Sequence, residues 1–249
     1  MIRLKNEKEI AGIRESGRLL AATLEELKKM VAEGITTRDL DSFARSWIEN
    51  HGGKPAFLGY MNYPASLCVS LNSEVIHGIP GSRKLRAGDI VSIDLGVDLN
   101  GYFSDAAITV PVGGTSRKRD RLIQVTRECL ERGVAEAVAG NRVSDISRAI
   151  FEHATANSFG VVREYCGHGT GFAMHEDPQV PNYVGGGPNP RLKEGMVLAI
   201  EPMINSGTGD IELREDGWTV VTADGADSAH FEHTVVVLRD RMEILTLFR

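Results

Sequence analysis

The sequence predicts an α+β protein made of two similar halves, each with two helices followed by antiparallel strands. Three observations predict this class: helical periodicity near the start of each half, a hairpin signal at Asn100-Gly101, and an internal repeat at an offset of 106 to 107 residues. Two such halves would be related by a pseudo-two-fold axis, with the helices on one face of a continuous sheet. We therefore expect a single domain over residues 1–249, with pseudo-repeats over about 1–115 and 116–249.

The composition excludes several classes of protein. The 249 residues carry a net charge of -6, which argues against a general surface for nucleic acid or anionic membrane. The N-terminus, MIRLKNEKEI, is charged and lacks the apolar stretch of a signal peptide, and no apolar run is long enough to span a membrane. Three cysteines without metal-ligand spacing favour a reducing compartment. We expect a cytoplasmic protein.

Two amphipathic helices open the chain. Apolar residues at alternating steps of three and four predict a long helix that Gly34 ends, namely Ile10, Ile13, Leu20, Leu24, Leu27 and Val31. Thr36 and Asp39 resemble a capping box for a second helix, which His51-Gly52-Gly53 ends. An aromatic-rich loop follows over residues 54–64. The alternation at Leu67, Val69 and Leu71 then predicts a strand, and Asn72-Ser73 turns the chain into another.

The next segment is a long hairpin, IVSIDLGVDLNGYFSDAAITV, over residues 90–110. Asn-Gly between two apolar runs predicts a two-residue type I′ turn. If Leu99 pairs with Tyr102, Asp94 and Asp105 lie on one face as diagonal cross-strand neighbours. An unpaired buried carboxylate is very costly, so a cation is expected between them. The alternative is a solvated face with two ordinary acids.

The repeat brings in two more acids. The segment LRAGDIVSID (85–94) matches LKEGMVLAIE (192–201), which places Asp94 on Glu201. The segment DAAITV (105–110) resembles EHTVVV (232–237), which places Asp105 beside Glu232. Four converging carboxylates either have raised pKa values or hold bound cations. Two divalent ions meet this demand, and such a pair can hold a hydroxide that attacks a carbonyl group.

Four histidines are candidates for the same site. His168 lies in Gly-His-Gly-Thr-Gly, where the backbone can approach closely, and an imidazole suits first-row metals; a structural hydrogen bond is the alternative. His175 and His77 open the segments HEDP and HGIP, and both are expected around the metals or the substrate. A zinc-protease HExxH is excluded because Gln179 follows His175 at the fourth position. The side chain of His230 would lie on the same face of a strand as that of Glu232 and could contact the metal site.

The motifs together carry a resemblance over essentially the whole chain. They are HGIP, VSIDLGVDLNGYFSD, REYCGHGTGFAMHEDPQV, LAIEPM and HFEHT. In these the chain resembles the bacterial type I methionine aminopeptidases of the pita-bread metalloaminopeptidase superfamily. The resemblance implies a pita-bread fold, with helices on one face of a curved sheet, and a single catalytic domain. It also implies hydrolytic removal of the initiator methionine from nascent proteins, with a small second residue preferred, through a dinuclear metal-bound hydroxide.

The resemblance also implies roles for individual residues. The positions that match the family's metal ligands are Asp94, Asp105, His168, Glu201 and Glu232. Glu201 is also the implied proton shuttle, and His77 and His175 would contact the peptide and stabilise the oxyanion or the leaving nitrogen. The implied methionine pocket is lined by Tyr60, Tyr63, Cys68, Met174 and Trp218, with Phe57 nearby.

The implied cofactors are two divalent metal ions, and the ligand set suits cobalt, manganese, iron or zinc alike. The implied partners are the N-termini of nascent polypeptides, with ribosome association left open; we expect a monomer that binds no membrane and no specific nucleic acid. Phe57, Met174 and His230 stand where the family commonly has cysteine, phenylalanine and glutamine. The shape of the pocket and the metal preference are therefore left open.

Two other functions compete with this one. An Xaa-Pro aminopeptidase or dipeptidase has the same fold, but such proteins resemble this chain only in their catalytic half and usually carry an extra N-terminal domain. A non-catalytic pita-bread module would bind peptide or nucleic acid instead. Such modules lose metal ligands, whereas all five expected ligands, four acids and one histidine, are present here.

Overall fold

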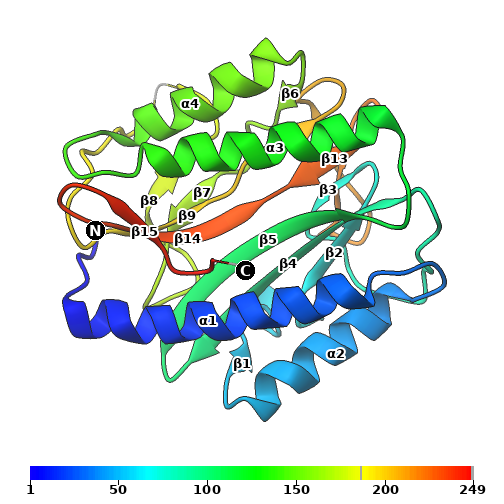
Figure 1. Ribbon diagram of the computed structural model, residues 1–249, viewed down its shortest axis with the longest axis horizontal. Coiled ribbons are helices and arrows are strands. Elements are labelled where there is room, and N and C mark those ends of the chain that lie inside the picture. Colours follow the sequence, from blue (N-terminus) through cyan, green and yellow to red (C-terminus); the bar gives the residue numbers. More distant parts are fainter. Residues whose placement is uncertain (186, 248–249) are drawn as a thin grey trace.

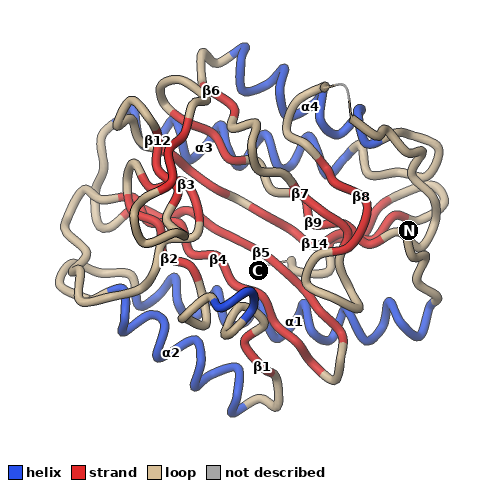
Figure 2. The backbone as a smooth tube through the Cα atoms, turned by 180° about the vertical axis from the view of Figure 1, so that it is seen from behind, coloured by secondary structure: helices blue, strands red, loops and turns tan. Residues whose placement is uncertain are grey.

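The computed structural model describes residues 1–185 and 187–247, so residues 186 and 248–249 of the second predicted pseudo-repeat lie outside the described residues. Two pairs of helices lie on one face of a nine-stranded sheet (Figure 1), and from the opposite side the strands lie in front of them (Figure 2). The helices are α1 (Glu7–Met30), α2 (Thr37–Asn50), α3 (Arg117–Ala135) and α4 (Val143–Ala156). The predicted α+β class, with helices on one face of the sheet, is confirmed.

The strands of the large sheet are antiparallel and follow the order β1-β4-β5-β14-β9-β7-β8, with β2 beside β4 and β15 beside β14. Their bounds are β1 (Lys54–Pro55), β2 (Cys68–Leu71), β4 (Ile90–Leu99), β5 (Tyr102–Pro111), β7 (Gly167–Gly169), β8 (Glu176–Val180), β9 (Val197–Ile200), β14 (Glu232–Val237) and β15 (Met242–Ile244). Two three-stranded sheets contain β6 (Gly160–Val161), β10 (Met203–Asn205) and β13 (Ser228–His230), and β3 (Glu74–Ile76), β11 (Ile211–Leu213) and β12 (Val220–Thr222). A 3-10 turn, η1, spans Tyr60–Asn62.

The two halves of the sheet meet where β5 lies beside β14. This ladder has only two residue pairs, Glu232 with Ala107 and His233 with Ala106. Two threonine hydroxyls continue the contact. The hydroxyl of Thr234 accepts a hydrogen bond from the Asp105 N–H (2.9 Å) and donates one to the Asp105 carbonyl (2.8 Å). On the other side of the ladder, the hydroxyl of Thr109 accepts from the N–H of His230 and donates to its carbonyl, at 2.9 and 2.8 Å. The short ladder is thus extended at both ends by side chains.

The hairpin forms as the turn sequence predicts. Leu99 pairs with Tyr102, Gly96 with Asp105 and Asp94 with Ala107. Asn100 (φ 56°) and Gly101 (φ 82°) both have positive φ, as a type I′ turn requires. The predicted capping box of α2 is also present, because Thr36 and Asp39 exchange hydrogen bonds between side chain and backbone. The register places both acids on one face of the hairpin.

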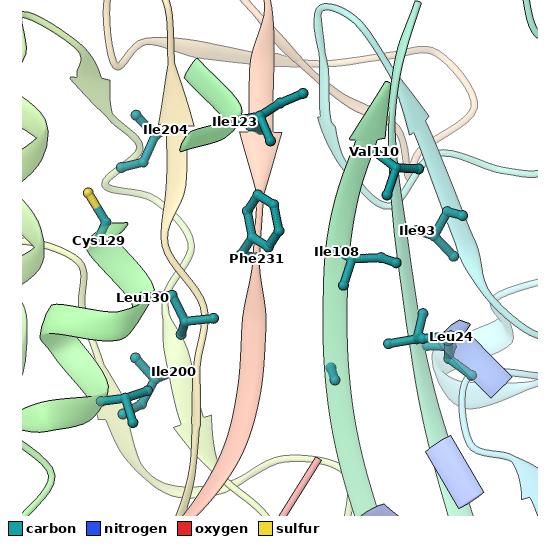
Figure 3. Packing of buried hydrophobic residues seen from close by; sticks show 14 of the residues in the cluster. Leu24, Ile93, Ile108, Val110, Ile123, Cys129, Leu130, Ile200, Ile204 and Phe231 are labelled. Carbon is teal, nitrogen blue, oxygen red and sulfur yellow. The ribbon is translucent and has the colours of Figure 1, made fainter. Parts of the chain in front are cut away.

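The main core lies between the helices and the sheet (Figure 3). Leu24 of α1 packs in the same cluster as Ile93 and Ile108 of the hairpin. On the other side, Leu130 of α3 packs in it with Phe231. Burial of these apolar faces provides the main driving force for the fold. No helix in the described part of the chain is apolar over a length that would cross a membrane.

We expect Gly17→Ala to destabilise the protein by about 1–3 kcal/mol, although alanine is normally the better residue inside a helix. A Cβ atom at Gly17 would overlap the backbone carbonyl of Leu245, which cannot rotate away. Gly12→Ala in the same helix is the control, since its Cβ would meet only the partly exposed ring of Tyr102. Urea unfolding measures both, and an equal or higher stability of Gly17→Ala would contradict the close packing of α1 on the C-terminal segment.

Candidate active site

Neighbouring strands of the large sheet each bring one polar side chain to one place. In sheet order these are Asp94 on β4, Asp105 on β5, Glu232 on β14, Glu201 directly after β9, and His168 on β7. The cross-strand pairing keeps two of the acids close, since both Asp94 and Glu232 pair with Ala107 of β5. The structure therefore brings together all five predicted metal ligands.

His168 lies among the acids. Its Nε2 atom is 3.7 Å from Oδ2 of Asp105 and 3.5 Å from Oε1 of Glu201. Single ligand atoms of Asp105, His168 and Glu232 all lie within 4.8 Å of one another, a spacing that one metal ion can bridge. The Nδ1 atom of His168 is 2.9 Å from the Gly169 carbonyl oxygen, which can only accept. Nδ1 therefore carries the proton of the neutral ring, and the Nε2 lone pair faces the acids.

Burial of the acids strongly disfavours their charged forms. It raises the pKa of Asp94 to about 7. Burial also raises the pKa values of Asp105, Glu201 and Glu232 well above their ordinary values, and the negative charges of the neighbouring acids add to the effect. For His168, burial and the nearby His175 lower the pKa to about 3, so the imidazole is neutral. The site thus combines four acids that need positive charge with a neutral nitrogen donor.

The donor set fits divalent metal ions. Asp94 Oδ1, Asp105 Oδ1 and Glu232 Oε1 are buried without a hydrogen-bond partner in the described part of the chain. Buried polar atoms are rarely left unpaired, and a carboxylate oxygen without a donor is a natural cation ligand. Carboxylate oxygens with one imidazole suit first-row divalent metals. The arrangement can therefore hold a metal ion and neutralise the cluster.

The two other predicted catalytic histidines also face this site. His175 is exposed, its ring centroid lies 4.2 Å from that of His168, and its Nδ1 is 2.8 Å from the hydroxyl of Tyr60. His77 has a positive φ of 59°, which is uncommon outside glycine and is found at functional sites. Its ring meets Tyr165 and Trp218 edge to face, with centroids 5.5 and 6.1 Å away. Burial lowers the pKa of His77 to about 4, so it is neutral near pH 7.

A cavity of about 300 Å³ adjoins the acids. Besides the acids and histidines described above, it is lined by Phe57, Tyr60, Met61, Tyr63, Cys68 and Trp218. Tyr63 and Trp218 meet edge to face at 5.0 Å between ring centroids, and the Tyr63 hydroxyl donates to the Gly78 carbonyl at 3.0 Å. Five of the residues predicted for a methionine pocket therefore line one apolar cavity.

The lining of the cavity differs from the prediction at two residues, Met174 and Met61. Met174 does not line the cavity: it is buried, and a Cβ placed on Gly96 would lie 2.9 Å from its sulfur and 2.9 Å from Phe57 Cε1. Because Gly96 has no side chain, there is room beside it for the side chains of both Met174 and Phe57. Met61 lines the cavity and was not predicted. Its place in the aromatic-rich loop between Tyr60 and Tyr63 was the available signal.

His230 lies beside the acids, as its strand position predicted. Its Nε2 is 3.8 Å from Oε2 of Glu201, and both ring nitrogens are buried without a hydrogen-bond partner in the described part of the chain. Burial and the nearby His77 lower its pKa to about 3. His230 is not among the residues that line the cavity. His230 therefore lies against Glu201 on the side of the acids that faces the protein interior, away from the cavity.

Comparison with known proteins gives close matches over the full length. The profile of metallopeptidase family M24 matches residues 11–239. The chain is 52% identical over 249 residues to a methionine aminopeptidase of Clostridium perfringens, covering 100% of both chains. It is 50% identical over 247 residues to one of Treponema pallidum, covering 99% of this chain and 96% of the relative. The crystal structure of methionine aminopeptidase from Rickettsia prowazekii superposes with a TM-score of 0.97 at 41% identity, covering 99% and 100% of the two chains.

More distant structures share the fold alone. Prolidase from Pyrococcus furiosus superposes with a TM-score of 0.82 at 24% identity, and the match covers 99% of this chain but 66% of the prolidase. Identity at this level carries no argument about substrate.

Removing the charge of Asp94 should stabilise the metal-free protein at neutral and higher pH. The pKa of Asp94 is raised from 3.8 to about 7 on folding, so between these values the folded state binds more protons and stability falls as pH rises; the difference corresponds to about 4 kcal/mol. We expect Asp94→Asn in chelator-treated protein to gain stability over the natural protein at pH 8 but not at pH 4.

Urea unfolding at both pH values measures this gain. Added divalent metal should reverse the order at pH 8, because the variant loses a carboxylate ligand. Asp98→Asn, on the same strand but outside the cluster, is the control. A pH-independent difference between Asp94→Asn and the natural protein would contradict the burial of an uncompensated charge.

Proposed function

The chain belongs to the methionine aminopeptidases of metallopeptidase family M24, and from this premise we propose that it removes the initiator methionine from nascent polypeptides whose second residue is small. The observation that carries the proposal is the set of neighbouring strands that aim four acids and one imidazole at an apolar cavity. The same cavity is lined by the acids and by the aromatic side chains of Phe57, Tyr60, Tyr63 and Trp218.

We assign the metal site to the acids and His168. Asp94, Asp105 and Glu232 would supply carboxylate oxygens, and His168 Nε2 and Glu201 would complete the ligand set. When bound there, two divalent ions such as cobalt, manganese, iron or zinc would polarise the scissile carbonyl and lower the pKa of water. The hydroxyl of Thr234 holds the backbone of Asp105 on both its N–H and its carbonyl, which keeps that ligand in place.

Proton transfer is assigned to Glu201. Glu201 lines the cavity beside the other acids, where its carboxylate could take up a proton and release it to the leaving nitrogen. Its two oxygens face different imidazoles, His168 from Oε1 and His230 from Oε2. The group can therefore act at one oxygen while the other stays oriented.

His175 and His77 are assigned to the peptide. Part of the His175 side chain is exposed, but its ring lies against His168 and Tyr60, and this partial removal from water lowers its pKa. The ring is therefore neutral near pH 7 and has a single N–H. When the Tyr60 hydroxyl donates to Nδ1, that N–H is at Nε2 and is free to stabilise the developing oxyanion. His77 lines the same cavity and would contact the peptide from the side of Trp218.

The methionine side chain is assigned to the aromatic part of the cavity. Phe57, Tyr60, Tyr63 and Trp218 present rings, and thioether sulfur makes favourable contacts with aromatic edges. Cys68 lies opposite Asp94 in the ladder between β2 and β4, and burial raises the pKa of its thiol well above the ordinary value. The thiol therefore stays neutral and acts as apolar wall.

The cellular setting belongs to the proposal as well. A protein that acts on nascent polypeptides would work in the cytoplasm, and the net charge of -6 supports one that binds neither anionic membrane nor specific nucleic acid there. Contact with the ribosome would bring it to these substrates.

Release of free methionine from Met-Ala-Ser, after metal removal and separate addition of manganese, cobalt, iron or zinc, tests the proposal. We expect metal-dependent release, with Leu-Ala-Ser nearly inert and Met-Leu-Ser slow. Asp105→Asn should lower kcat/KM at least about a hundredfold and reduce metal content, whereas Cys129→Ser in the core of α3 should change neither.

Each competing function predicts a different result. Hydrolysis of Ala-Pro with little release from Met-Ala-Ser would indicate a proline-specific enzyme. Stoichiometric metal binding without turnover would indicate a non-catalytic module. Full activity of Asp105→Asn would contradict the metal assignment.

His175→Ala should lower kcat by about two to three orders of magnitude, the usual cost of losing an oxyanion donor, and leave the metal content unchanged. Tyr60→Phe, which removes only the hydroxyl partner of Nδ1, should cost less. Steady-state kinetics with metal analysis on the same samples distinguish the two. Loss of metal in His175→Ala would place His175 among the ligands instead.

A further inference from the structure

Lys5 is a buried cation close to the proposed active site. Its side chain is 1% exposed, and its Nζ atom is 2.7 Å from Oε2 of Glu176, whose side chain is 8% exposed. Burial lowers the pKa of Lys5, while the hydrogen bond and the charge of Glu176 oppose that shift. A buried ammonium needs such a partner to stay charged.

Glu176 uses its other oxygen to hold a loop. Oε1 accepts hydrogen bonds from the N–H of Phe172 at 2.7 Å and from that of Ala173 at 3.2 Å. The loop continues through Met174 to His175, which precedes Glu176 directly. One carboxylate therefore joins Lys5 to the segment that carries His175.

The position of Lys5 is itself fixed by the sheet. The N–H of Lys5 donates to the carbonyl of Gly195 at 2.7 Å. The N–H of Gly195 in turn donates to the carbonyl of Val237, at the end of β14, at 3.0 Å. The loop packs directly on the lysine stem, since a Cβ placed on Gly171 would lie 3.0 Å from Lys5 Cε. Hydrogen bonds and packing contacts therefore connect β14 to the loop through Lys5.

We propose that Lys5 is a positioning residue, which through its ion pair with Glu176 fixes the Phe172–His175 loop and so sets where His175 meets the peptide. The inference rests on the proposed function, because the proposed function assigns the peptide substrate to His175. It adds a residue that lies far from the acids in sequence, in a segment that precedes α1.

The test is Lys5→Met, which keeps the length of the stem and removes the charge. Hydrogen exchange of metal-free protein should show amides 172 and 173 exchanging at least about tenfold faster, with β4 and β5 unchanged. In metal-loaded protein, kcat for Met-Ala-Ser per folded enzyme should fall on the order of ten- to a hundredfold, while KM changes less, because the methionine pocket stays intact.

Arg14→Met is the matched control. It breaks another partly buried ion pair on the same N-terminal part of the chain, with Glu243 of β15, at 2.7 Å. It should lower the melting temperature but leave the exchange of amides 172 and 173 and kcat per folded enzyme unchanged. If Lys5→Met does not fold, Glu176→Gln tests the same connection, and it should also speed the exchange of both amides.

Unchanged exchange and unchanged kcat in Lys5→Met or Glu176→Gln would overturn the positioning role and leave the proposed function intact. An equal fall in kcat in Arg14→Met would also overturn the positioning role, because the loss would then reflect lower stability in general. Failure of the natural protein to release methionine would overturn the proposed function instead. The exchange result would then still report whether Lys5 holds the loop.

Discussion

The mutual repulsion of four buried carboxylates is the constraint on which the rest of the structure depends. Asp94, Asp105, Glu201 and Glu232 have raised pKa values because they are removed from water and lie close together. A flexible scaffold would relieve this by moving them apart. Here neighbouring strands of one sheet fix their backbones, so relief comes from protonation or from bound cations. The cost of holding the acids together therefore favours the binding of divalent cations among them.

The seam between β5 and β14 shows how that rigidity is obtained. Its ladder has two residue pairs, and the hydroxyls of Thr234 and Thr109 each take both backbone groups of one residue on the opposite side. Thr234 fixes Asp105, and Thr109 fixes His230, which lies against Glu201. Side-chain hydrogen bonds thus replace regular pairing at the place where the two halves join. The same contacts hold the two halves of the sheet together and orient the groups of the proposed metal site.

Around this rigid centre the substrate site is built from loops. Tyr60, His77, His175 and Trp218 come from four separate segments. The Tyr60 hydroxyl meets His175, and the ring of His77 meets those of Tyr165 and Trp218. The loop that carries His175 depends on Glu176 and, through it, on Lys5 near the start of the chain. Loops can vary without disturbing the sheet, so the shape of the proposed methionine pocket and the position of His175 can change while the proposed metal ligands keep their places.

The sequence by itself determined the parts whose signals are local. The Asn100-Gly101 turn set the hairpin register, and with it the shared face of Asp94 and Asp105, because a two-residue turn leaves one pairing. The repeat added Glu201 and Glu232, since duplicated strands keep their polar positions. The capping residues Thr36 and Asp39 likewise placed the start of α2, whereas α1 ends at Met30, a few residues before Gly34.

Only the tertiary structure decided contacts between distant segments. The strand order that places β5 beside β14, and so brings the four acids to one point, depends on packing between the halves. Met174 and Phe57 both fit beside Gly96 because it has no side chain, and Met61 reaches the cavity from a loop without periodicity. The Lys5 and Glu176 pair joins residues 171 positions apart. Such contacts leave no local pattern in the sequence, because they are selected by the shape of the whole fold.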